Sequence, residues 1–169
     1  MNNIPGMTSQ IVGTDISKYA VKNAAKKYKD NFYFVSSVFN LPVATEGIDL
    51  ILSIFSPLQP EEFKRILTKD GYVIVVSPGE NHLKELAELI YDNFREHENN
   101  VIEKMIPSLE YQTTKKATFN IHITDVESLL ILLKMTPYYW STSKENLTKI
   151  ESCNDINITC DFNISIFKR

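Results

Sequence analysis

The chain has 169 residues, of which 43% are hydrophobic and 11% aromatic, and this is enough apolar material for one substantial core. The formal charge of -3 excludes a global positive field that would attract RNA, DNA or an anionic membrane, so any contact with nucleic acid must use local patches. No apolar run approaches the roughly 20 residues that span a bilayer, and no leader peptide is recognisable. We therefore expect a single domain, residues 1–169, in a cytoplasmic protein without a membrane partner.

The first part of the sequence predicts two strands around a helix, followed by a third strand. The run QIVGTD, residues 10–15, is apolar enough for a strand, and Ser17 can cap the helix that follows it. Residues 32–36 are expected to form the second strand. The third, at residues 49–55, is apolar along almost its whole length, which favours a central parallel strand buried on both faces.

Strand and helix continue to alternate up to about residue 100. Pro60 opens a helix with carboxylates in its first turn, and a strand follows at residues 72–76. Residues 77–79 then lead into a helix whose apolar face contains Leu83, Leu86, Ala87, Ile90 and Phe94. Repeated alternation of this kind predicts an α/β fold with a doubly wound sheet and right-handed crossovers.

The last part of the sequence changes character. Residues 119–124 alternate between apolar and polar side chains, as in a half-buried strand, and the pairs Thr124/Glu127 and Thr142/Glu145 have the spacing of capping boxes. From residue 156 to residue 166 the apolar side chains share one parity, which predicts an antiparallel strand added to the sheet.

The two cysteines indicate neither a metal site nor a disulfide framework. Cys153 and Cys160 lie seven positions apart, with no Cys-x-x-Cys pair and no nearby pair of histidines. We expect two small core or half-buried thiols.

The candidate ligand site follows from the strand order. In an open α/β sheet, ligands lie beyond the carboxyl ends of the strands, and Asp15 stands at such an end, directly before a helix. Its carboxylate can accept hydrogen bonds from both ribose hydroxyls of a nucleoside cofactor, although an Asp in this place more often caps the helix. A nucleotide-binding fold also needs a glycine-rich turn about 20 residues upstream of the acid. Only fourteen residues precede Asp15, and they hold no such turn.

A family resemblance rests on six segments. They are GTDISKYAVKNAAKKY at residues 13–28, FVSSVFNLPV at 34–43, GIDLILSIFSP at 47–57, SPGENHLKELAELIY at 77–91, LLKMTPYYW at 132–140 and DFNISIFKR at 161–169. Together they resemble the large-subunit ribosomal-RNA guanine-N1 methyltransferases, and SPGENHL and KMTPYYW are more particular to this family than the generic pattern. The resemblance implies a class I (Rossmann-like) methyltransferase sheet with antiparallel C-terminal strands. It also implies S-adenosylmethionine as cofactor and ribosomal RNA as partner.

The resemblance also implies roles for individual residues. Asp15 matches the acid that binds the cofactor ribose, with Ile16 beside the adenine, and Ser36 and Ser37 occupy the place where the adenine edge is contacted. No catalytic residue is identified. The substrate pocket is expected to contain Ser53, Phe55, Ser56, Pro57, His82 and Trp140.

The sequence also departs from this family. Members resemble one another in an amino-terminal four-cysteine zinc module and a glycine-rich cofactor motif, and neither occurs in this sequence. We therefore expect a methyltransferase sheet truncated at its N-terminus. The lost strand would leave backbone groups in the middle of the sheet unpaired, which predicts a tendency to form a homodimer or to aggregate.

Several alternatives stay open at this point. His82 and His122 fit polar surface or capping residues as well as catalytic ones. The aromatic run at residues 138–140 could stack on an RNA base or pack as core, and Lys115 and Lys116 could contact phosphate or simply face solvent. The protein could also methylate a small molecule, or it could be a non-catalytic remnant of the fold.

Overall fold

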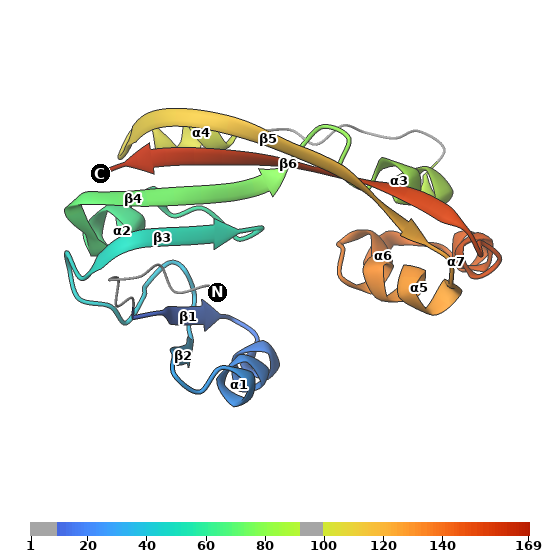
Figure 1. Cartoon of the computed structure of the whole chain (residues 1–169), viewed down its shortest axis with the longest axis horizontal. Coiled ribbons are helices and arrows are strands. Elements are labelled where there is room, and N and C mark those ends of the chain that lie inside the picture. The colour runs from blue at the N-terminus through green and yellow to red at the C-terminus, as the bar shows by residue number, and fades with distance from the viewer. Residues whose placement is uncertain (1–9, 92–99) are drawn as a thin grey trace, which may run out of the picture.

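The computed structural model describes residues 10–91 and 100–169 (Figure 1). In chain order the elements are β1 (Val12–Asp15), α1 (Lys18–Lys27), β2 (Phe32–Val35), β3 (Ile48–Ile54), α2 (Pro60–Ile66), β4 (Leu67–Pro78), α3 (Lys84–Ile90), α4 (Val101–Met105), β5 (Glu110–Ile123), α5 (Val126–Lys134), α6 (Tyr138–Ser141), α7 (Lys144–Glu151) and β6 (Ile156–Lys168). The predicted α/β class is confirmed.

The described strands form two sheets. β1 and β2 pair in parallel, and the other four strands have the order β3-β4-β6-β5. β3 is parallel to β4, whereas β6 is antiparallel to both of its neighbours, β4 and β5. The expectation of an antiparallel C-terminal strand is therefore confirmed, but the sheet is split into two parts.

β3 is an edge strand, so the prediction of a central strand buried on both faces is wrong for this structure. Its side chains at Leu50, Leu52 and Ile54 are 55%, 55% and 54% exposed, whereas Ser53 on the opposite face is buried. The reason is that the core contributed by α2 and α4 lies against one face only. An apolar run predicts burial, but it does not say whether both neighbours and both covering layers are present.

The split lies between β1 and β3. Figure 1 shows β1 between β2 and β3 and pointing in the same direction as β3, yet β1 and β3 belong to different sheets. Doubly wound sheets with the order 3-2-1-4-5-6 place their first strand between the second and the fourth. If β1 corresponds to the second strand of that order and β3 to the fourth, the place of the first strand lies between β1 and β3. Among the described residues, neither strand has a partner on the edge that faces this position.

Two hydrophobic clusters hold the larger sheet. The first joins α2 and α4 to β4 and β6, with Phe63, Leu67, Val73, Val75, Val101, Met105, Leu109 and Phe167. The second joins α3, α5 and α7 to the start of β6, with Leu83, Leu86, Ile90, Leu129, Leu133, Ile150 and Ile158. No residue from 10 to 40 is buried. The β1–α1–β2 unit is thus formed by local pairing and capping, without a core of its own.

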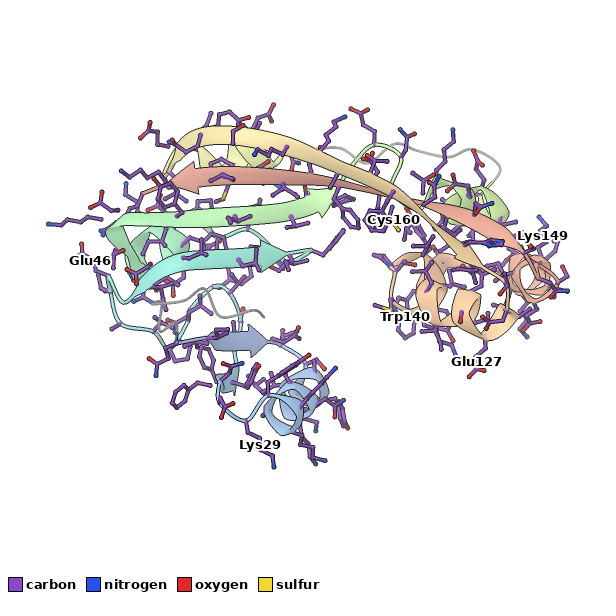
Figure 2. The ribbon with its side chains drawn as sticks, in the orientation of Figure 1. Lys29, Glu46, Glu127, Trp140, Lys149 and Cys160 are labelled. Carbon is purple, nitrogen blue, oxygen red and sulfur yellow. The ribbon has the colours of Figure 1, made fainter. Side chains whose placement is uncertain are left out.

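β6 has one continuous alternation in its sequence but two buried faces in the structure. Ile158 and Cys160 are buried in its first part, whereas Asp161 and Phe167, which have the opposite parity, are buried in its second part. The switch occurs beside Cys160, which Figure 2 labels in the middle of the strand. The strand changes face because Ile158 packs in the second cluster and Phe167 in the first. The predicted thiol environments are confirmed, since Cys160 is buried and Cys153 half-buried.

Helix starts agree with the sequence at some positions and shift by one residue at others. Ser17 caps α1 and Pro60 opens α2, as predicted. The caps of α5 and α7 are Asp125 and Ser143, not the threonines that precede them. Thr142 instead ends the preceding helix α6, where its hydroxyl donates to the carbonyl of Tyr138.

Two further expectations concern Phe94 and membrane spans. Phe94, expected on the apolar face of α3, lies outside the described residues. Within the described ranges, no helix is long and apolar enough to cross a membrane.

Candidate active site

The first part of the candidate site lies at the carboxyl ends of β1 and β2. The parallel register sets Asp15 opposite Val35, and the Ser36 amide donates to the Asp15 carbonyl at 3.2 Å. The Asp15 carboxylate is exposed, and its Oδ1 accepts the Ser17 amide at 2.7 Å. The N-cap of α1 is Ser17, and Asp15 holds the backbone of that cap residue with one oxygen, which leaves the other carboxylate oxygen without a hydrogen bond to any described residue.

The remaining cofactor candidates gather around Asp15. Ile16 is 80% exposed, and an apolar side chain so placed could cover one face of an adenine ring. The Ser36 hydroxyl points into its own loop, where it donates to the carbonyls of Ser37 and Asn40 at 3.1 and 3.2 Å. The Ser37 hydroxyl accepts the Phe39 amide at 3.4 Å. The side chains of Asp15 and Ile16 are therefore exposed to a ligand, whereas the hydroxyls of Ser36 and Ser37 take part in hydrogen bonds within their own loop.

The second part of the site is the loop after β3. Phe55 has a left-handed backbone, with φ of 49°, and its amide donates to the carbonyl of Val76 at 3.1 Å. A non-glycine residue in this conformation is strained, and such strain often occurs at functional sites. The hydroxyls of Ser53 and Ser56 lie 2.9 Å apart. This hydrogen bond ties the buried end of β3 to the loop that follows it.

A cavity of about 290 Å³ lies beneath this loop. Ser56, Pro57, Ser77 and Lys104 are among the residues that line it. Ser77 Oγ is buried, and no described atom makes a hydrogen bond to it. Of the residues expected in the substrate pocket, Phe55, Ser56 and Pro57 line this cavity, together with residues of β4 and α4. Ser53, His82 and Trp140 do not line it.

The motif SPGENHL owes its shape to Asp161 of β6. The Asp161 carboxylate accepts the Asn81 amide at 3.2 Å and the Thr118 hydroxyl at 2.8 Å. The Gly79 amide donates to the Asp161 carbonyl at 2.9 Å, and a Cβ at Gly79 would overlap the Asp161 carboxylate. Position 79 therefore needs glycine because the carboxylate occupies the space of a side chain.

Asp161 is ionised over a wide pH range. Burial raises its pKa, but hydrogen bonds from Thr118 and Asn81, with the charge of Lys116, outweigh burial and leave the pKa below its usual value. The Asp161 amide also donates to Nδ1 of His82 at 3.3 Å. This buried anion thus orders the loop that presents His82.

Aromatic rings surround His82. The centroid of the Phe162 ring lies 4.8 Å from that of His82, 5.9 Å from that of Phe55 and 5.8 Å from that of Phe119. Phe55 and His82 are 5.4 Å apart. The structure therefore brings together two predicted pocket residues, Phe55 and His82, with two that the sequence missed. Phe119 and Phe162 could not be recognised because each lies in a strand pattern that predicts a packing role.

Trp140 stands apart from this group. It is 86% exposed on α6, and Figure 2 shows it on the side of the α5–α7 group that faces the β1–α1–β2 unit. The centroid of its ring lies 5.3 Å from that of the Tyr139 ring. Tyr138 and Tyr139 pack against the second cluster, so the aromatic run at 138–140 is divided between core and surface.

The other candidates lie at the surface. His122 Nε2 pairs with Asp155 Oδ1 at 3.0 Å in an exposed position, which fits a polar surface residue. Among the described residues, no group of three or more His, Cys, Asp and Glu side chains could hold a metal ion.

Comparisons with known proteins agree with this geometry. The family described as methyltransferase domain matches residues 2–151. YxjB of Bacillus subtilis, named for a proposed 23S rRNA (guanine-N1) methyltransferase activity, is 32% identical over 157 residues, which are 91% of this chain and 55% of YxjB. The 23S rRNA (guanine(748)-N1)-methyltransferase of Streptomyces fradiae is 28% identical over 138 residues, which are 80% of this chain and 49% of that enzyme.

The chain thus spans about half the length of these curated relatives. Among solved structures, the YcgJ protein of Bacillus subtilis superimposes with a TM-score of 0.62 at 17% identity, covering 95% of this chain and 82% of YcgJ. At that identity the likeness concerns the fold alone. The family match covers most of the sequence, and the chain belongs to the methyltransferase-domain family, with a class I methyltransferase fold.

Proposed function

We propose that this chain forms part of an S-adenosylmethionine-dependent enzyme that methylates N1 of a guanine in ribosomal RNA. One observation carries the proposal. Asp15 and the loop at residues 53–57 lie at the carboxyl ends of strands that point the same way, so the cofactor and acceptor candidates share one edge of the fold (Figure 1). The names of the relatives and the two family motifs support guanine N1 of ribosomal RNA as the acceptor.

The proposed division of roles follows the two sheets. Asp15 accepts hydrogen bonds from the cofactor ribose and Ile16 covers the adenine, with the 36–37 loop at its edge. The residues after β3 and β4, with His82 and Trp140, form the acceptor side. When bound, S-adenosylmethionine supplies an electrophilic methyl group, and the chain positions the two partners.

Neither His82 nor Asp161 suits the role of general base for the guanine N1 proton. Nδ1 of His82 accepts a backbone amide, so the neutral ring carries its proton on Nε2. Asp161 holds its proton weakly, because its carboxylate already accepts hydrogen bonds from Thr118 and Asn81. We propose that the described residues act by positioning the guanine, and that they do not themselves remove its N1 proton.

The open edges of β1 and β3 favour association with another polypeptide. Unpaired strand edges are templates for further strands, and within residues 10–91 and 100–169 no strand pairs with the facing edges of β1 and β3. We propose that a second copy of this chain uses these edges, giving a homodimer. A strictly monomeric, folded species in sedimentation velocity experiments contradicts this. We also propose that the chain is a single methyltransferase domain and that it works in the cytoplasm, where its ribosomal-RNA acceptor would be found.

Calorimetric titration with S-adenosylmethionine and S-adenosylhomocysteine tests the proposal. We expect a dissociation constant near the micromolar range and loss of binding in Asp15→Ala, with Asp30→Ala as the matched surface control. Undermodified ribosomal RNA then serves as methyl acceptor, with small-molecule acceptors for comparison. Absence of cofactor binding in the wild type instead supports a non-catalytic remnant, for which the divided sheet is the specific argument.

A further inference from the structure

Four aromatic side chains, two of them exposed and two half-buried, form a group at the carboxyl edge of the larger sheet. We call Phe55, His82, Phe119 and Phe162 the aromatic seat. Phe162 lies at its centre, with ring centroids 4.8 to 5.9 Å from the other three. Phe55 and Phe119 are 52% and 53% exposed, so the seat offers ring surface to a ligand instead of burying it.

A strained backbone conformation and a buried carboxylate hold two members of the aromatic seat in place. Phe55 has a left-handed backbone, and His82 stands in a loop fixed by the buried Asp161 carboxylate. About half of the Phe55 and Phe119 side-chain surface stays in solvent, and this part gains nothing from burial, so packing alone does not explain why it is presented here.

A basic side chain lies beside the seat. Lys115, Ala117 and Phe119 alternate along β5 and share one face, and the register sets Lys115 opposite Ile164 and Ala117 opposite Phe162. Lys116 points to the other face, where it pairs with Glu80 at 3.9 Å. Lys115 makes no ion pair with any described residue, and its side chain is exposed.

We infer that the aromatic seat stacks on an unpaired purine base of the RNA substrate, while Lys115 contacts a phosphate of the same strand. Aromatic rings beside a cation match the chemistry of single-stranded RNA, in which flat bases alternate with phosphates. The inference rests on the proposed function and deepens it, because it assigns Phe162, Phe119 and Lys115 to acceptor binding. The adenine of the cofactor is placed elsewhere, beside Ile16 of the other sheet.

Stacking and phosphate contact can be separated by two readouts on one probe. The probe is a short single-stranded RNA with a central 2-aminopurine, whose fluorescence is quenched when the base stacks. Phe162→Leu should lose most of the quenching and bind about tenfold more weakly, which is within the range for one base–aromatic stack. Its affinity should keep the salt dependence of the wild type, because no charge is changed.

Lys115→Gln should behave in the opposite way. We expect the slope of log affinity against log salt to fall by about one, with the quenching of the bound probe unchanged. Phe32→Leu is the matched control, because Phe32 is 60% exposed and lies in β2 of the other sheet, at the start of the strand. Its replacement should alter neither readout. Phe119→Leu repeats the stacking test at an exposed site, in case Phe162→Leu does not fold.

Cofactor titration in parallel distinguishes this inference from the proposed function. Quenching by a wild type that does not bind S-adenosylmethionine supports the seat and counts against cofactor binding. Cofactor binding without quenching, or equal quenching by the wild type and both phenylalanine variants, overturns the seat.

Discussion

The β1–α1–β2 unit and the β3–β6 sheet start from equally clear sequence signals but reach different degrees of burial. No residue from 10 to 40 is buried, whereas Val73 and Phe167 in the larger sheet are completely inaccessible. Capping and strand pairing form in both regions. The difference teaches that local signals produce the elements, while burial of side chains from distant segments stabilises them.

The contrast has a direct bearing on the site. The cofactor candidates Asp15 and Ile16 stand on the unit without a core, and the acceptor candidates Phe55 and His82 stand on the sheet with one. A two-stranded sheet and a ten-residue helix are each marginal in water. We therefore expect the cofactor side to open locally and the acceptor side to remain ordered.

Core truncation should show the largest contrast. Phe167→Ala removes a fully buried ring from the first cluster, and we expect it to lower the free energy of unfolding by about 3–5 kcal/mol. Phe32→Ala, in the unit without a core, should change it by less than about 0.5 kcal/mol. Urea denaturation followed by circular dichroism measures both. Similar losses in the two variants would show that the β1–α1–β2 unit shares the main core.

Amide hydrogen exchange should reveal the same division without mutation. We expect the amides of residues 12–15 to exchange at least about 100-fold faster than those of Val73 and Val75, because the former open locally and the latter only on global unfolding. Added S-adenosylmethionine should slow the fast group if the cofactor binds there. Equal protection in the two sheets contradicts the comparison.

Acid should destabilise the larger sheet through Asp161. Its folded pKa is below the ordinary value of 3.8, so its contribution to stability is present above that pH and is lost as the pH falls through the folded pKa. The free energy of unfolding should therefore decline as the pH falls below about 4. Asp161→Asn should flatten this decline, as measured by urea denaturation at several pH values. An unchanged pH profile in the variant would remove Asp161 as its cause.

The smallest expected contrast is between two helix caps. Ser143 caps α7, which buries Ile150, and Ser143→Ala should cost about 1 kcal/mol of global stability. Ser17 caps α1 in the same way, with its hydroxyl accepting the Ala20 amide at 3.3 Å. Ser17→Ala should change the global free energy of unfolding by less than about 0.3 kcal/mol. The reason is that the β1–α1–β2 unit is expected to open before the larger sheet unfolds, so losing its cap does not affect global unfolding. Equal costs would argue for one cooperative structure.

Much of the fold could be predicted because its signals are local. The cap at Ser17, the proline that opens α2 and the alternation of strand and helix each depend on a few neighbouring residues. The caps of α5 and α7 lie one residue later than predicted, because a second side chain able to cap, Asp125 or Ser143, follows each threonine. Only the structure shows that Thr142 belongs to the end of α6.

The candidate site was predicted in parts. Position after a strand is a local property, so Asp15 and Phe55 could be singled out, and His82 was named because it lies in the family motif SPGENHL. Phe162 and Asp161 could not, because alternation along β6 presents them as ordinary strand residues. Only the register with β4 and β5 sets Asp161 under Gly79 and Phe162 against Phe55.

The sequence by itself determined most of the elements, their order and the family, since these depend on periodicity, turn chemistry and recognisable segments. It did not indicate the short helices α4 and α6, and β4 and β5 are longer than their local patterns predicted. Tertiary structure decided which faces are buried. β6 changes its buried face beside Cys160 because two separate clusters meet it along its length, and β3 exposes Leu50 and Leu52 because one of its edges and one of its faces find no partner among the described residues. Burial depends on contacts between segments far apart in the chain, and no local pattern encodes whether those contacts are made.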